Sequence, residues 1–487
     1  MKEISKVRKI AFVGDHLPRK CGIATFTSDL LAAVATANPK SQCFSVSVSD
    51  IEGGYDYPDV VRFEIEEQDL SSYLRAADFL NISNVDIVCL QHEFGIFGGA
   101  AGGHILALLR ELRMPVVTTL HTILNEPRAD QRRVMRELIT LSTRLVVMTE
   151  RGKRMLQDIY EAPPAKIDLI AHGIPDVAFV DPTYFKDQFG VEGKVVLLTF
   201  GLLSPNKGIE CVLSALPGIL SEFPDVVYIV LGATHPNELR EHGESYRLSL
   251  EILAKKNKVE KNVIFYNQFV DLENLTEFIG AADLYITPYL NEAQITSGTL
   301  AYAFGAGKAV VSTPYWHAAE LLDEDRGVLV PFGDSEAIAR EVTSLLSDDP
   351  RRHAIRKSAY RIGREMIWSN VAQLYMRSFE LSRLDGPALS RKSLAAKTLD
   401  QRPRELPELK LNHLLRMTDS TGVFQHAIFG VPNFSEGYCT DDNARAFILA
   451  VLLGELGERK WCAAWPPHTG PFFATPSIQR RSAFTIT

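Results

Sequence analysis

The chain has 487 residues, enough for two or three domains, and its 46% hydrophobic and 23% charged residues are typical of a soluble globular protein. A formal net charge of −8 provides no overall basic field and argues against nucleic acid as a partner. The basic N-terminus precedes an apolar run only one strand long, and no two of the cysteines form a C-x-x-C pair. We therefore expect a cytoplasmic protein without a signal peptide, a transmembrane segment, a disulfide framework or a zinc site.

The N-terminal part alternates apolar strands with helical segments. The predicted strands cover residues 10–14, 85–90, 116–120, 145–148 and 167–170. A helix is predicted to begin at Gly22, after a loop that follows the first strand. Because it lacks G-x-G-x-x-G, this turn resembles a phosphate-binding loop only weakly and is not the dinucleotide fingerprint.

Polar side chains follow several of these strands. Gln91 and Glu93 come after the strand at 85–90, and His121 follows the strand at 116–120. Ligands of open parallel sheets bind beyond the carboxyl ends of the strands, which makes these residues site candidates. The alternative for His121 is a histidine that forms structural hydrogen bonds only.

A second α/β unit begins with the predicted strand at 195–201, after a polar, proline-containing linker. In its first turn Lys207 directly precedes Gly208 at the start of a helix. A lysine in this position pairs with a phosphate as a point charge. The alternative is a lysine that is only solvated.

The stretch from residue 285 to 322 reads as strand, polar loop, helix of small residues and strand. Gly298 opens the helix, and the hydroxyls of Ser297 and Thr299 flank it. A helix N-terminus presents free N–H groups, so the stretch predicts a site for an anion such as a diphosphate. An ordinary strand-to-helix turn is the alternative.

Taken together, eight segments resemble the family-4 retaining glycosyltransferases of the GT-B fold, especially the mannosyltransferase-like branch. In chain order these segments, which fall in the family's order within residues 9–383, are GIATFTSDLL, QHEFGIFGG, VVTTLHTILNEPR, IDLIAHGIPD, FGLLSPNKGIE, LGATHPN, PYLNEAQITSGTLAYAFGAGKAVVSTP and GVLVPFGD. The resemblance implies an α/β GT-B fold, in which two Rossmann-like domains face each other across a cleft.

The expected domains follow from this resemblance. Residues 1–180 would form the acceptor-side domain, completed by a crossing helix at 368–383, and residues 181–367 the donor-side domain. The charge- and proline-rich stretch 384–410 is a predicted linker. Residues 411–487 are predicted to be an incomplete, mainly α fragment with an irregular tail, and they resemble the start of an α-helical toroid.

The resemblance also implies roles for individual residues. His121 would contact the donor sugar, Lys207 would bind the donor diphosphate, and Gly22 would face the same phosphates. The segment under the diphosphate and sugar would be Ser297, Gly298 and Thr299, and the base edge would be lined by Phe269 and Val270. Position alone places Gln91 and Glu93 at the mouth of the cleft, as acceptor-binding residues.

Three departures from the family pattern concern the same site. Leu202 replaces the arginine that usually precedes Lys207 by five residues. Of the usual two glutamates, either Glu292 or Gln294 would fill the first place, and Tyr302 stands at the second, where a glutamate normally holds the ribose hydroxyls. We take His121 and Glu292, the latter as the carboxylate, as the catalytic residues, and Gln294 as a donor-binding residue.

The function implied is a hexosyltransferase of polysaccharide biosynthesis, with GDP-mannose as the favoured donor and a saccharide or glycoconjugate as acceptor. We expect no cofactor and no essential metal, because no D-x-D follows a strand. Peripheral membrane contact remains open. The alternatives are a glycoside phosphorylase on the same fold and a non-catalytic protein that binds sugars or nucleotides.

Overall fold

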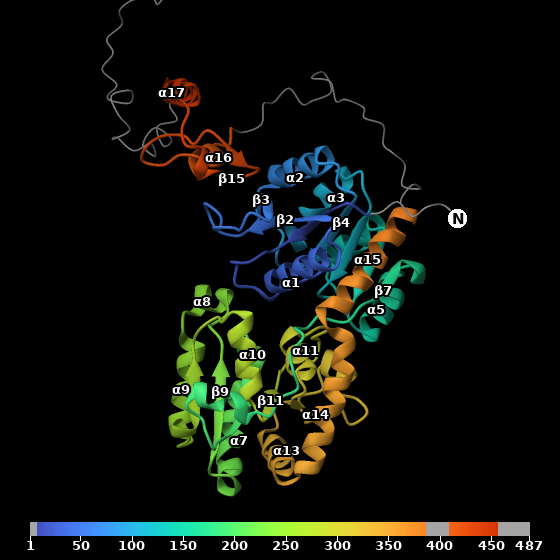
Figure 1. Cartoon of the computed structure of the whole chain (residues 1–487), viewed down its shortest axis with the longest axis vertical. Helices are drawn as coiled ribbons and strands as arrows, with labels where there is room; N and C mark the ends of the chain where they lie inside the picture. Colours follow the sequence, from blue (N-terminus) through green and yellow to red (C-terminus); the bar gives the residue numbers. More distant parts are fainter. Residues whose placement is uncertain (1–6, 386–408, 456–487) are drawn as a thin grey trace, which may run out of the picture.

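Two parallel β-sheets organise the computed structural model of the chain, which describes residues 7–385 and 409–455 (Figure 1). Each sheet carries helices on both faces, and the two α/β domains lie one above the other in the view. A smaller C-terminal segment lies beside the first domain. Most of the predicted linker 384–410 and residues 456–487 of the predicted tail fall outside the described residues.

The first domain is built on a seven-stranded parallel sheet with the strand order β3-β2-β1-β4-β5-β6-β7. Its strands are β1 (Lys9–Gly14), β2 (Gln42–Ser49), β3 (Val61–Glu66), β4 (Ile87–His92), β5 (Val116–Leu120), β6 (Arg144–Val147) and β7 (Ile167–Leu169). Its helices are α1 (Gly22–Ala37), α2 (Leu70–Ile82), α3 (Ile105–Glu111), α4 (Ala129–Leu141) and α5 (Glu150–Tyr160). The central strands are apolar on both faces because helices cover both sides of the sheet.

The second domain repeats this plan with a six-stranded sheet in the order β10-β9-β8-β11-β12-β13. Its strands are β8 (Val195–Phe200), β9 (Val226–Leu231), β10 (Val263–Tyr266), β11 (Leu284–Thr287), β12 (Ala309–Ser312) and β13 (Val328–Leu329). The helices are α6 (Thr183–Lys186), α7 (Ile209–Glu222), α8 (Pro236–His242), α9 (Ser245–Lys256), α10 (Leu272–Ala281), α11 (Gly298–Gly305), α12 (Trp316–Leu321), α13 (Ser335–Ser347) and α14 (Asp349–Gly363). The prediction of a GT-B fold is confirmed by this pair of domains.

Helix α15 (Trp368–Asp385) leaves the second domain and packs on α1 of the first (Figure 1). Its buried residues Val371, Tyr375 and Phe379 join the core under β1 and β5. The Tyr375 hydroxyl lies 2.9 Å from Oγ1 of Thr119, at the end of β5. The crossing helix therefore completes the first domain while it ties the two domains together.

A second link between the domains is made at the N-terminus of α5. The Glu320 carboxylate of α12 accepts the backbone N–H groups of Glu150, at 2.7 Å, and of Arg151, at 3.1 Å. The Arg151 guanidinium lies 4.2 Å from the centre of the Trp316 ring. The carboxylate satisfies donors that a helix start leaves free and complements the positive end of the helix dipole.

Residues 409–455 form α16 (Asn412–Arg416), the hairpin strands β14 (Ala427–Ile428) and β15 (Val431–Pro432), and α17 (Thr440–Glu455). This segment contacts β3 and α2, on the outer edge of the first domain. Arg416 pairs with the buried Glu64 carboxylate at 2.6 Å, and the Phe429 ring lies 4.5 Å from that of Phe79. Across the described ranges, no helix is both long and apolar enough to span a membrane.

We predict that deletion of residues 400–487 leaves a folded two-domain protein. The deletion removes Arg416, but it also uncovers the Glu64 carboxylate, so that water solvates the charge in place of the guanidinium. Arg416→Met in the full chain should instead release the segment, since it leaves a buried carboxylate without its cation, at a cost of about 3 kcal/mol. Thermal unfolding of the deletion variant and limited proteolysis of Arg416→Met test this, with the exposed Arg445→Met as control. Aggregation of the deletion variant would contradict it.

Candidate active site

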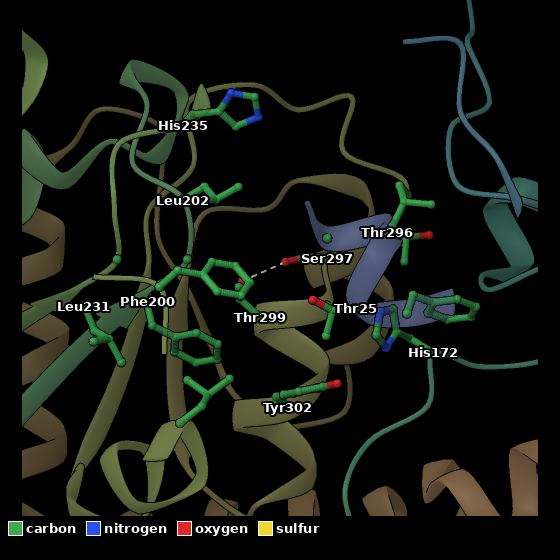
Figure 2. Close-up of a pocket in the computed structure, with 18 of the residues that line it drawn as sticks. Thr25, His172, Phe200, Leu202, Leu231, His235, Thr296, Ser297, Thr299 and Tyr302 are labelled. Carbon is green, nitrogen blue, oxygen red and sulfur yellow. Dashed lines mark hydrogen bonds between the residues drawn. The ribbon is translucent and has the colours of Figure 1, made fainter. Parts of the chain in front are cut away.

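A cavity of about 520 Å³ opens between the two domains. Its walls come from the carboxyl ends of both sheets and from the helices that follow them. The residues that the first domain contributes are Leu17, Gly22, Ile23, Thr25, Phe26, Asp29, Glu93, His121, Thr122 and His172. The second domain contributes, among others, Leu202, Lys207, Phe269, Val270, Tyr289, Gln294, Thr296, Ser297, Gly298, Thr299 and Tyr302. Figure 2 labels ten of the lining residues, among them Thr25 and His172 of the first domain and Ser297, Thr299 and Tyr302 of the second.

The start of α11 forms one wall of this cavity. Ser297 has extended backbone angles and its hydroxyl accepts the Leu300 N–H at 3.3 Å, as an N-cap residue does. The next two N–H groups, of Gly298 and Thr299, belong to the first turn and have no partner within the helix. A β-carbon at residue 298 would meet Nε2 of His172 at 2.9 Å and force that ring to shift, so glycine leaves the ring in place. An anion fits against this helix start.

Lys207 lies next to this helix start and is held by hydrogen bonds. Its ammonium donates to the Tyr289 hydroxyl at 2.6 Å, which lies 3.0 Å from Oγ1 of Thr299. The Thr299 hydroxyl in turn lies 3.2 Å from Oγ of Ser297. Burial acts to raise the pKa of Tyr289, but the Lys207 ammonium and the hydrogen bonds from Lys207, Thr299 and Ser297 together lower this pKa below its ordinary value. The chain of hydroxyls joins the cation to the helix start.

His121 faces this anion site from the first domain, at the end of β5. Its Nε2 lies 3.0 Å from Oε1 of Gln91, whose amide nitrogen donates to Sγ of Cys89. Burial, with a smaller effect of the neighbouring His172, lowers the pKa of His121 to about 3. The neutral ring therefore donates from Nε2 to Gln91, and Nδ1 remains free to accept a hydrogen bond from a ligand hydroxyl.

Three further histidines surround the site in neutral form. His172 donates from Nδ1 to the Gly173 carbonyl at 2.7 Å, and Nδ1 of His317 accepts the Ser297 N–H at 2.8 Å. Burial lowers the pKa of His172 to about 4 and the pKa values of His317 and His92 to about 3. His172 and His317 therefore hold backbone groups in place, and none of the three rings adds positive charge.

Four more of the predicted residues also line the cavity. Gly22 opens α1 and Phe269 and Val270 follow β10, and all three line the cavity. Glu93 also lines it, and its carboxylate accepts hydrogen bonds from the Thr122 hydroxyl and from the Phe94 N–H, at 3.0 Å for the latter. Burial raises the pKa of this carboxyl.

The structure places two of the predicted residues away from the cavity lining. Glu292 is exposed, its carboxylate accepts the indole N–H of Trp316 at 3.3 Å, and it is not among the cavity-lining residues. Gln294 lines the cavity instead. Gln91 is fully buried beneath His121 and therefore lies beneath the cleft mouth, where it orients the histidine. The sequence spacing could not separate Glu292 from Gln294, because both lie in one irregular loop.

The sequence analysis also missed contributors to the site. Asp29 on α1 accepts a hydrogen bond from the Tyr302 hydroxyl on α11 at 2.8 Å, across the two domains. Asp29 lies within an amphipathic helix, and nothing in its local pattern distinguishes it from a solvated carboxylate. Among residues 7–385 and 409–455, no cluster of three or more His, Cys, Asp or Glu side chains has the arrangement of a metal site.

Two α/β domains with facing carboxyl edges and a cavity between them define the GT-B architecture. The Glycosyl transferases group 1 family matches residues 181–362, and Glycosyltransferase Family 4 matches residues 22–177. Over these residues the chain therefore consists of the two domains of a GT-B glycosyltransferase. Neither match extends to the C-terminal segment, so its resemblance to a toroid stays a prediction.

Curated relatives are similar to parts of the chain. The phosphatidyl-myo-inositol mannosyltransferase of Mycolicibacterium smegmatis is 29% identical over 213 residues, 43% of this chain and 51% of that protein. A D-inositol 3-phosphate glycosyltransferase of Corynebacterium kroppenstedtii is 27% identical over 311 residues, 58% of this chain and 66% of that protein. The matched region thus spans about half of the mannosyltransferase's own length.

Solved structures share the fold at lower identity. The crystal structure of Anabaena HepE in complex with UDP and glucose is 16% identical, with a TM-score of 0.60 over 77% of this chain and 100% of that one. A glycosyltransferase from Rickettsia africae is 17% identical, with a TM-score of 0.61 over 79% of this chain and 100% of that one. These likenesses concern the fold alone.

We predict that Lys207→Ala weakens binding of a nucleoside diphosphate about 10- to 100-fold, because a charge-assisted contact contributes roughly 1.5–3 kcal/mol. The difference from the parent should shrink as salt is added. Isothermal titration at two ionic strengths measures both effects, with Lys153→Ala on α5 as the matched control. Equal affinities at low salt would make Lys207 a surface residue only.

We predict that His92 makes the folded protein less stable at acidic pH. Its two ring nitrogens are buried without hydrogen-bond partners among the described residues, and burial lowers its pKa from 6.5 to about 3. The unfolded chain therefore binds a proton that the folded chain does not. Relative to His92→Phe, the parent should lose ~1.4 kcal/mol of stability per unit as the pH falls below 6.5. Urea unfolding at several pH values tests this, and a flat difference would contradict it.

Proposed function

We propose that the protein is a retaining glycosyltransferase that moves a hexosyl group, with mannose favoured, from a nucleoside diphosphate sugar to a saccharide or glycoconjugate acceptor. The observation that carries the proposal is the cavity itself, where Lys207 and the start of α11 lie opposite His121. Such an arrangement holds a diphosphate against one domain and the attached sugar against the other. The mannosyltransferase named above supports mannose, and GDP-mannose is the donor that we favour.

The proposed reaction breaks the bond between the anomeric carbon and the diphosphate oxygen, which keeps the electron pair. Negative charge thus grows beside Lys207 and beside the N–H groups of Gly298 and Thr299, where fixed dipoles stabilise it. The acceptor oxygen bonds to the anomeric carbon on the face from which the diphosphate leaves, and the acceptor's proton passes to the departing diphosphate oxygen. Holding both substrates in the cavity supplies the entropic part of the rate enhancement.

His121 and Glu93 have different parts in this proposal. Because Nδ1 of the neutral His121 ring is an acceptor, it is suited to a donor-sugar hydroxyl and not to a phosphate. Glu93 lies on the same wall, and its carboxylate is already held by Thr122. We therefore assign Glu93 to an acceptor hydroxyl, which it would orient by accepting a hydrogen bond.

The test is product analysis with GDP-mannose, UDP-glucose and other nucleotide sugars, with and without a chelator. Release of a nucleoside diphosphate together with a glycoside of unchanged anomeric configuration is the expected result. A requirement for added divalent metal would contradict the proposed metal-independent reaction. Thermal-shift measurements with GDP, UDP, ADP and phosphate select the donor beforehand.

We predict different consequences for the two residues of the 292–294 loop. Gln294→Ala should lower kcat about 100-fold, roughly 2.7 kcal/mol, if its amide contacts the donor in the transition state. Glu292→Gln should stay within about threefold of the parent, because the new amide oxygen still accepts from Trp316 and the side chain is outside the cavity. Steady-state kinetics distinguish these outcomes. The reverse pattern would restore Glu292 as the catalytic carboxylate.

A glycoside phosphorylase is the second candidate, and the observation in its favour is Leu202. With leucine at this position, Lys207 is the one lysine or arginine among the described residues that line the cavity. A single cation is better matched to inorganic phosphate than to a diphosphate. Formation of a sugar 1-phosphate from phosphate and a glycoside, without any nucleotide, would favour this candidate.

A further inference from the structure

Inside the cavity the two domains are joined by the pair Asp29 and Tyr302. The Tyr302 hydroxyl donates to Oδ2 of Asp29 at 2.8 Å, and both residues line the cavity. Figure 2 shows Tyr302 on α11 with its hydroxyl pointing toward the side where Thr25 and His172 of the first domain lie. Tyr302 is buried, with 6% of its surface exposed, so its direction is fixed by packing.

Asp29 retains capacity for a ligand. A carboxylate accepts about four hydrogen bonds, and Tyr302 uses one. Oδ1 of Asp29 has no hydrogen-bond partner within the described part of the chain. Burial raises the pKa of Asp29 to about 6, although the bond from Tyr302 lowers it. Hydroxyl donors from a ligand would compensate this lost hydration and stabilise the ionised form.

Tyr302 lies about one helical turn from the start of α11, where the anion site is located. Thr299 and Tyr302 are three residues apart on α11, which corresponds to a rise of about 4.5 Å along the helix axis. The ring of Tyr302 then extends sideways to α1. A ligand whose diphosphate lies at the start of α11 therefore places the sugar that is bonded to the diphosphate beside Asp29. Two neighbouring hydroxyls of that sugar are then within reach of the carboxylate.

Among the described residues that line the cavity, the second domain offers one carboxylate, that of Asp271. Tyr302 occupies the position on α11, and Gln294 in the preceding loop carries a neutral amide whose nitrogen donates to the Thr296 carbonyl at 2.7 Å. Among the residues that line the cavity, the carboxylates are Asp29, Glu93 and Asp271. Asp271 caps α10 by accepting the Asn274 N–H at 2.9 Å, and Glu93 is engaged by Thr122. Among these cavity-lining carboxylates, Asp29 thus has an oxygen that is free to accept a hydrogen bond from a ligand.

We propose that Asp29 and Tyr302 form a cross-domain site for the vicinal diol of the donor's ribose, with the Asp29 carboxylate accepting from the ribose hydroxyls. The inference rests on the proposed function, because it takes a nucleotide as the ligand of the cavity. Tyr302 acts as a positioning residue that holds the carboxylate. Since the diol is bound by the first domain and the diphosphate by the second, the nucleotide bridges both domains.

Isothermal titration with ribo- and 2′-deoxyribonucleotides tests the site. The probe is whichever of GDP, UDP and ADP binds the parent most tightly, paired with its 2′-deoxy form. We expect the parent to bind the deoxy form at least tenfold more weakly. In Asp29→Asn this ratio should fall to about two or less, and in Tyr302→Phe it should fall in part. Asp158→Asn, on the exposed face of α5, is the matched control and should keep the parent's ratio.

Each outcome of the titration bears on the inference. An unchanged ratio in a folded Asp29→Asn variant, verified by its melting curve, would overturn the assignment of the ribose to Asp29. So would loss, in that variant, of the parent's preference for a nucleotide sugar over the bare diphosphate, because this would place the hexose there. Binding of phosphate or mannose 1-phosphate by the parent, without binding of any nucleotide, would show separately that the proposed function fails.

Discussion

The packing of α15 on α1 is the constraint on which the rest of the structure depends. Val371, Tyr375 and Phe379 are almost fully buried against the first domain, whereas the chain that leads into α15 comes from α14 of the second. This burial fixes the direction in which the two sheets face. Parallel strands place their following loops at one edge, so fixing the sheets also brings the ligand-binding edges together.

The site between the two domains depends on uncharged polar side chains as much as on charged ones. His121 and His172 line the cavity together with several hydroxyls and one ammonium group, and burial keeps these two rings uncharged. The helix dipole and Lys207 are therefore the main sources of positive potential for an anion. Each neutral ring contributes an acceptor or donor in a fixed direction, and fixed dipoles are effective in a site from which water is largely excluded.

The fold was predictable from the sequence because its signals are local and repeated. Apolar runs such as residues 195–201, followed by a turn and an amphipathic helix, identify the βα units, and Ser297 with Gly298 identifies a helix start. Residues that follow strands, such as His121 and Lys207, could therefore be placed at the edge of the sheets where the cavity lies. Asp29 and Tyr302 could not, because their partnership depends on how the two domains face each other.

Within the 292–294 loop, too, the sequence could not predict which side chain faces the cavity. The exposed carboxylate and the cavity-lining amide are two positions apart, and the irregular backbone between them has no period from which orientation can be read. The backbone carbonyls of Glu292 and Gln294 accept the N–H groups of Trp316 and His317, so α12 decides which side chain turns inward. Such a contact is formed only in the folded chain.

The Glu320 contact with the N-terminus of α5 has a consequence for the opening of the two domains. When they separate, Glu320 leaves and the N–H groups of Glu150 and Arg151 face solvent at the positive end of a helix. A bare helix start attracts small anions. Sulfate or phosphate in the buffer would then occupy the place of the carboxylate and favour the separated arrangement. The apparent openness of the protein would therefore depend on the anion of the medium.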